Sequence, residues 1–238
     1  MTKRTYRSAG GKKRAEAQKR RAIILLVIVG VAIIGLAILG FRLLPAKDKE
    51  PIATPEPKLE QEELLSLEGA PPIDVQLLTP NEYSRPQIEL RKIKGVVVHY
   101  IANPGSSAQA NRDYFENLKD THTTKASSHF VIGLEGEIIQ CIPSSEIAYT
   151  SNDRNIDTLS IESCHPDESG ELTTPTYESL VELTGWLCWR HGLKSSDVIR
   201  HYDVTGKICP KYFVDNEEAW ERFLADVQAD IDGREDNN

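Results

Sequence analysis

The chain has 238 residues, of which 27% are charged, and its formal net charge at pH 7 is −8. That length corresponds to one or two domains. The charge is unevenly divided: residues 1–21 contain nine Lys or Arg and one Glu, which leaves a net charge of −16 on the rest. So acidic a remainder argues against a nucleic-acid-binding protein, because phosphate backbones are bound by basic surfaces.

An apolar run follows the basic segment directly. Residues 22–41 contain no charged or polar side chain, and at about 1.5 Å per residue a helix of this length spans the roughly 30 Å core of a bilayer. A cleaved signal peptide is the alternative, but its apolar region is shorter and ends in a small-residue cleavage motif, which is missing here. We therefore predict a single-pass anchor over residues 22–44. Basic residues 1–21 then lie in the cytoplasm, and the rest of the chain lies outside the cell membrane.

The anchor is followed by a segment of biased composition. Residues 45–72 are rich in Pro and Glu and poor in aromatic residues, which is typical of an extended linker. We predict one globular domain over residues 73–232, which forms a monomer, and a disordered tail over residues 233–238.

Within this domain, strand and helix patterns alternate. Strands are predicted from short apolar runs rich in β-branched residues at 94–102, 127–133, 138–143 and 158–164, the middle two forming a hairpin. Helices are predicted from apolar spacing at 107–120, 176–193 and 216–231. This order indicates the α/β class, a sheet with helices packed on it.

The segment RHYDVTGKICPKYF, residues 200–213, has neither a helical nor a strand period. Its His201 and Cys209 are zinc-ligand types, and a catalytic zinc site takes three protein ligands and leaves one position open. His99 lies at the end of the strand segment GVVVHY, residues 95–100, and is the candidate third ligand, although a lone histidine at a strand end is more often structural.

Two further residues suit hydrolytic chemistry. Glu162 lies in the apolar segment TLSIESC, and a buried carboxylate beside a metal is a reasonable general base. The alternative is a glutamate on an edge strand that faces water. Lys207 is a candidate donor to an oxyanion, against the commoner case of a solvated loop lysine.

Four segments in this order carry a family resemblance: VVVHYIANPG, ASSHFVIGLEGEIIQCIP, DTLSIESCHPD and RHYDVTGKICPKYF. They resemble the zinc-dependent N-acetylmuramoyl-L-alanine amidases of the amidase type 2 family, which also contains the peptidoglycan recognition proteins. The resemblance runs from about residue 74 to 230. It implies a mixed central β-sheet flanked by helices, a Zn²⁺ cofactor, and peptidoglycan as the substrate.

The same resemblance implies roles for particular residues. The zinc ligands fall on His99, His201 and Cys209, the catalytic glutamate on Glu162 and the oxyanion-assisting lysine on Lys207. Some relatives have a catalytic tyrosine at the position of Ser128, and this departure assigns the proton transfer to Glu162.

The other histidines and cysteines carry weaker expectations. His129 matches a family position near the cleft, and we expect it to contact substrate or to support a ligand. His165 is interpreted as a loop residue at the edge of the cleft, with a substrate contact as the alternative. Cys141 and Cys188 are predicted to be small buried residues. A Cys164–Cys188 disulfide is open, because spacing alone cannot establish it.

The sequence therefore predicts a membrane-anchored bacterial zinc amidase that cleaves the bond between N-acetylmuramic acid and L-alanine in the cell wall. Three alternatives stay open at this point: a module that binds peptidoglycan without cleaving it, a membrane scaffold, and an enzyme that cleaves another amide of the wall.

Overall fold

The computed structural model of the protein describes residues 67–236. The predicted cytoplasmic segment, the anchor at residues 22–44 and most of the linker lie outside these residues. Within residues 67–236, none of the helices combines the length and the hydropathy that a membrane-spanning segment requires.

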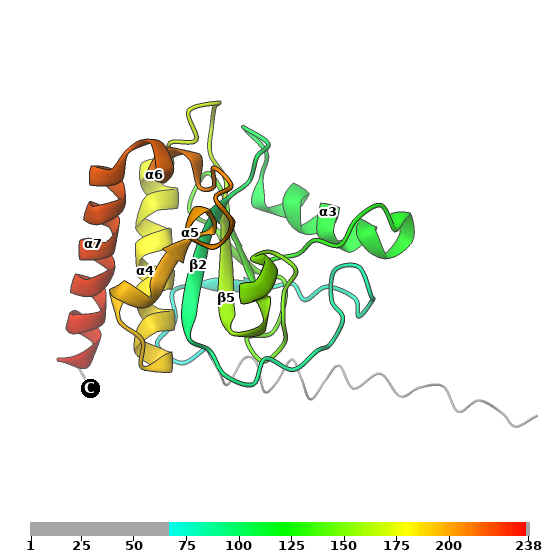
Figure 1. The fold of residues 1–238 in the computed structure, drawn as a ribbon, viewed down its shortest axis with the longest axis horizontal. Coiled ribbons are helices and arrows are strands. Elements are labelled where there is room, and N and C mark those ends of the chain that lie inside the picture. Colours follow the sequence, from blue (N-terminus) through cyan, green and yellow to red (C-terminus); the bar gives the residue numbers. More distant parts are fainter. Residues whose placement is uncertain (1–66, 237–238) are drawn as a thin grey trace, which may run out of the picture. The chain divides into compact units, whose positions relative to one another are not determined.

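A six-stranded sheet forms the centre of the fold (Figure 1). The strand order is β1-β4-β3-β5-β2-β6, and every neighbouring pair is parallel except the antiparallel hairpin β3–β4. The prediction of a mixed sheet is thus confirmed. The strands are β1 (Ile73–Val75), β2 (Gly95–Tyr100), β3 (Phe130–Ile132), β4 (Ile138–Gln140), β5 (Thr158–Ser163) and β6 (Val198–Arg200).

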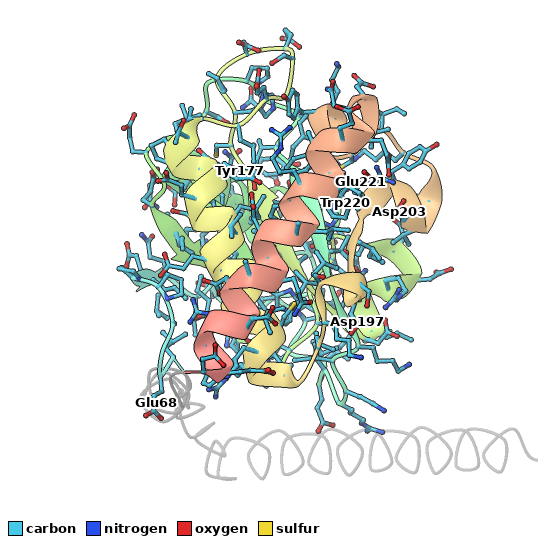
Figure 2. All side chains as sticks on the ribbon, turned by 90° about the vertical axis from the view of Figure 1, so that its left-hand side faces the viewer. Glu68, Tyr177, Asp197, Asp203, Trp220 and Glu221 are labelled. Carbon is cyan, nitrogen blue, oxygen red and sulfur yellow. The ribbon has the colours of Figure 1, made fainter. Side chains whose placement is uncertain are left out.

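Helices cover both faces of the sheet. Helices α4 (Thr174–His191) and α7 (Glu217–Glu235) pack together on one face, and α3 (Ala108–Thr121) lies on the other (Figure 1). Figure 2 shows α4 and α7 side by side in front of the sheet, where the Tyr177 hydroxyl donates to Asp226 Oδ2 at 2.6 Å and so links the two helices. The shorter helices are η1 (Asn152–Ile156), η2 (Ser195–Asp197), α5 (His201–Thr205) and α6 (Lys211–Asp215).

The two-residue period of the central strands decides which side chains face which helices. Val96 and Val98 of β2 join the core beneath α4 and α7, and so do Leu159 and Ile161 of β5. Because successive side chains of a strand point to opposite faces, the next residues, His99 and Glu162, point away from α4 and α7. The sheet therefore presents these two polar side chains together on the face of α3.

Two segments depart from the sequence-based expectations. The segment 200–213 contains α5 and α6, each too short to show a helical period; α5 begins where Asp203 Oδ2 accepts from the backbone N–H of Arg200 at 2.8 Å. Helix α7 continues into the predicted tail 233–238 as far as Glu235, where the Arg234 guanidinium donates to the Gly69 carbonyl oxygen at 2.8 Å.

All four cysteines are free, so the Cys164–Cys188 disulfide is not formed. The reason is topological. Cys188 belongs to the core beneath α4 and α7, whereas Cys164 belongs to the core beneath α3, and the sheet separates them.

His129, directly before β3, is a buried polar residue with only 1% of its surface exposed. The Ser160 backbone N–H donates to its Nδ1 at 3.1 Å, and its Nε2 lies 2.9 Å from the Glu146 carbonyl oxygen. A carbonyl only accepts, so Nε2 carries the proton and the ring is neutral. Burial lowers the pKa of His129 to about 4.

This burial predicts a pH-dependent stability. Between about pH 6.5 and pH 4 the unfolded chain binds a proton at residue 129 that the folded chain does not. The contribution of His129 to the free energy of unfolding should therefore be complete above pH 6.5 and fall by about 3 kcal/mol across this window as the pH is lowered. Glu162, whose pKa burial raises to about 8, contributes in the opposite sense. Urea unfolding followed by circular dichroism at several pH values measures the slope. The His129→Gln variant lacks this contribution. Whatever its absolute stability, its free energy of unfolding should fall by about 3 kcal/mol less than that of the unaltered protein between pH 6.5 and pH 4; equal slopes would contradict the prediction.

Candidate metal centre

Three neighbouring parallel strands deliver functional residues to one edge of the sheet. His99 is the next-to-last residue of β2, Glu162 is the next-to-last residue of β5, and His201 directly follows β6. Strand β2 lies between the other two, and His99 pairs in register with Glu162. Because the strands run in the same direction, their carboxyl ends meet and bring the three side chains together.

Cys209 reaches the same edge from the loop after α5. The backbone N–H of Tyr202 donates to the Cys209 carbonyl oxygen at 2.9 Å, which folds the loop back onto the start of α5. Gly206 ends α5 with a φ of 77°, a left-handed conformation that glycine adopts without strain. The turn places Cys209 beside His201 and leaves Lys207 exposed between them in the chain.

A buried arginine fixes this loop to the rest of the domain. The Arg200 guanidinium donates to Asp203 Oδ1 at 3.0 Å, to the Phe213 carbonyl oxygen at 3.0 Å and to Glu217 Oε2 at 2.7 Å. It also lies 5.2 Å from the centre of the Trp220 ring; Asp203 and Trp220 are marked in Figure 2. These contacts link α5 to α6 and α7. Arg200, which directly precedes His201, is therefore fixed by three separate helices.

His99, His201 and Cys209 form a compact buried cluster, whose ligand atoms all lie within 4.8 Å of one another. His99 Nδ1 is 3.7 Å from Cys209 Sγ, and His201 Nδ1 is enclosed without a hydrogen-bond partner. A buried polar atom without a partner is costly unless something binds it. Two imidazole nitrogens and one thiolate are a donor set that suits a catalytic zinc ion. The residues present therefore fit zinc.

The protonation of these ligands follows from their burial. Burial lowers the pKa of His99 well below its usual value, and the neighbouring His201 and Lys207 lower it further. Both effects favour the neutral imidazole, which is the form that binds metal. Burial raises the pKa of the Cys209 thiol to about 12. A coordinated cation is what ionises such a thiol near neutral pH.

Glu162 faces the same space. It lies on the central strand β5, which rules out the alternative of a water-facing edge strand. Its Oε2 atom is enclosed and has no hydrogen-bond partner, and burial raises the pKa of the carboxyl to about 8, an effect that Lys207 partly offsets. A carboxyl group whose pKa lies near neutral pH can both accept and donate a proton, which suits it to proton transfer.

The cluster opens into a cleft of about 730 Å³. His99, Glu162, His201 and Lys207 line it, together with residues that the sequence did not single out: Lys125, Tyr149, Thr150, Asn152 and Asn155. Lys125, Tyr149 and Thr150 come from irregular segments, and Asn152 and Asn155 from η1, which is too short to show a period. The one available signal was the dense polar run YTSNDRN at residues 149–155, between the hairpin and β5.

The remaining predicted residues lie elsewhere. Neither His129 nor His165 lines the cleft, and both are 1% exposed. The His165 ring nitrogens lie 2.6 Å and 2.5 Å from the carbonyl oxygens of Asp167 and Ile101, which gives that ring a structural role in its loop. Ser128 is buried, and its hydroxyl donates to the Ser160 carbonyl oxygen at 3.1 Å. A direct substrate contact from these residues therefore has no structural support.

Comparison with known proteins agrees with this site. A family model described as N-acetylmuramoyl-L-alanine amidase matches residues 89–212, which include all five of the residues assigned to zinc binding and catalysis. The chain is 36% identical over 163 residues to the N-acetylmuramoyl-L-alanine amidase CwlL of Bacillus licheniformis, covering 63% of this chain and 44% of that protein. It is 31% identical over 175 residues to the amidase BlyA of Bacillus subtilis strain 168, covering 65% and 46%. The chain thus spans less than half the length of these two relatives.

Solved structures share the fold. PlyL superposes with a TM-score of 0.58 at 22% identity, over 67% of this chain and 99% of that one. The catalytic domain of XlyA superposes with a TM-score of 0.56 at 24% identity, over 66% and 99%. Since the family model covers more than half of the sequence, the protein belongs to the N-acetylmuramoyl-L-alanine amidase family, amidase type 2.

Proposed function

We propose that the protein is a zinc-dependent N-acetylmuramoyl-L-alanine amidase. Its substrate is peptidoglycan, and the bond cleaved joins N-acetylmuramic acid to L-alanine of the stem peptide. Family membership and the names of the relatives support the reaction. The observation that carries the proposal is the buried His99–His201–Cys209 cluster, whose two histidines line one cleft with Glu162 and Lys207.

His99, His201 and Cys209 would hold zinc, which when bound supplies Lewis-acid chemistry: it polarises an amide carbonyl and lowers the pKa of water. Glu162, as a carboxylate that lines the cleft, accepts a proton from the attacking water. It then returns this proton to the nitrogen of L-alanine as the C–N bond breaks. Lys207 donates a hydrogen bond to the oxyanion that develops on the substrate carbonyl. Protons balance, because the one taken from water leaves with the amine.

The reaction is tested with the full-length protein in mild detergent and purified peptidoglycan, with products identified by mass spectrometry. We expect stem peptides with a free L-alanine amino terminus, lost on chelation and restored by zinc. Glu162→Gln should keep zinc and lose about 10²–10⁴ in rate, because it removes the proton acceptor. Cys209→Ala should lose zinc as well as activity, whereas Cys188→Ala, a buried thiol on the other face of the sheet, should keep both.

Other results would point to the alternatives. Retained binding to the wall without any cleavage would favour a non-catalytic binding module. Cleavage at another amide would place the chain in a sister chemistry. Full function of Cys209→Ala in the cell would favour a scaffold.

Lys207 provides a separate kinetic prediction. An oxyanion exists only in and near the transition state, so Lys207→Ala should lower kcat by about 10²–10³ and leave KM nearly unchanged. Lys211→Ala, which removes a nearby lysine that pairs with Asp215 at 2.7 Å, is the matched control and should change little. Steady-state kinetics with a soluble muropeptide gives both constants. A rise in KM at constant kcat would show that Lys207 binds substrate instead.

We also propose that residues 22–44 anchor the protein in the cell membrane, with residues 1–21 in the cytoplasm and the amidase domain facing the wall. The uninterrupted apolar run and the nine basic residues before it support this. The full chain should sediment with membranes, and external protease should digest the domain in cells stripped of their wall. Deletion of residues 1–44 should release the protein into the soluble fraction. Protection from the protease in wall-stripped cells whose membrane is intact would contradict the orientation.

A further inference from the structure

Two consecutive residues contact the two histidines of the candidate metal centre. Ser151 Oγ lies 3.0 Å from His99 Nε2, and Asn152 Oδ1 lies 3.0 Å from His201 Nε2. In each ring this is the nitrogen opposite Nδ1. The Nδ1 atoms are the ones that His99 directs at Cys209 and that His201 leaves without a partner.

The chemistry of these contacts determines where the ring protons lie. A side-chain amide oxygen only accepts, so His201 Nε2 must donate to Asn152 and its Nδ1 keeps a free lone pair. The Ser151 hydroxyl oxygen can accept from His99 Nε2 in the same way. Both rings then have the Nε2–H tautomer, and both Nδ1 lone pairs are available for a metal.

The turn that carries these two residues, at the start of η1, is itself fixed. Asn155 Oδ1 accepts from the backbone N–H groups of Thr150, at 3.1 Å, and Ser151, at 2.6 Å. Asn152 has a φ of 53°, in the left-handed region that asparagine tolerates better than most residues. Ser151 is 1% exposed and has no room to move away. The turn thus holds two acceptors at the spacing of the two imidazoles.

We propose that Ser151 and Asn152 are positioning residues that fix both imidazoles in the Nε2–H tautomer and aim their Nδ1 atoms at the metal. The proposal rests on the zinc dependence proposed above. Partners of this kind orient a histidine ligand and make it more basic, and their loss typically weakens metal binding by about 10–100-fold.

The test measures zinc affinity of the full-length protein by competition with a chromophoric chelator, which requires no turnover. Ser151→Ala removes one acceptor. Asn152→Gly removes the other and still permits the positive φ, so that backbone strain does not contribute. Each variant should bind zinc about 10–100-fold more weakly than the unaltered protein. Ser151→Thr and Asn152→Asp keep an acceptor oxygen and should retain most of the affinity.

Two further measurements separate positioning from general damage to the fold. Gln87→Gly, at another non-glycine residue with positive φ (56°), is the matched control and should leave zinc affinity unchanged. With cobalt in place of zinc, the visible absorption bands should shift in Ser151→Ala and Asn152→Gly but not in Gln87→Gly, because only the first two alter ligand orientation. Melting temperatures in excess chelator identify any variant that merely unfolds.

The outcomes are distinguishable. Zinc affinities and cobalt spectra equal to those of the unaltered protein in both loss-of-acceptor variants would overturn the positioning role and leave the proposed amidase intact. Weakened binding that is rescued by the two conservative variants would support the positioning role, even if the protein cleaved no peptidoglycan and the proposed function failed. Absence of zinc binding by the unaltered protein would overturn both.

Discussion

The parallel pairing of β2 with β5 is the constraint on which the site depends. It sets His99 opposite Glu162, and a slip of one residue would turn one of them into the core beneath α4 and α7. The register is held by apolar partners on that other face: Val96 pairs with Leu159 and Val98 with Ile161, all fully buried. The hydrophobic core on one side of the sheet therefore aligns the polar chemistry on the other.

Burial makes the charged forms of the site's thiol and carboxyl groups unfavourable, and a single bound cation would offset this cost. Without a metal, burial raises the pKa of the Cys209 thiol and of the Glu162 carboxyl, so their charged forms are disfavoured. Burial lowers the pKa of His99, which keeps that ring neutral. A dication accepts the neutral imidazole as it stands and stabilises the thiolate and the carboxylate. A metal held by this site would also add to the stability of the fold, because the unfolded chain lacks the assembled ligands. The same desolvation that weakens the isolated ligands thus strengthens their interaction with a metal.

Sequence patterns predicted those parts of the fold that local composition controls. The β-branched run ending at His99 and the helix that ends at Gly192 lie where expected, because apolar period and caps are local. The candidate ligands and Glu162 were singled out because their segments resemble family motifs. Helix α5 was missed, since it depends on Arg200 reaching Phe213 and Glu217 across the fold. His129 was placed near the cleft by its motif, and only the tertiary contacts show that its ring is fully engaged.

The side chains proposed for catalysis and most of the surrounding cleft wall come from different parts of the fold. The turn at residues 149–155 is the exception. The side chains proposed to react come from strand ends and the loop of Cys209. Much of the surrounding wall comes from the irregular segment of Lys125 and from residues 149–155, a turn that leads into the short helix η1. Walls of this kind tolerate change, because few backbone contacts of the sheet depend on them. The turn at 149–155 differs: it lines the cleft and also holds both histidine rings through Ser151 and Asn152. Variation in substrate preference should therefore concentrate in the other walls, since a change in this turn would disturb the metal centre as well.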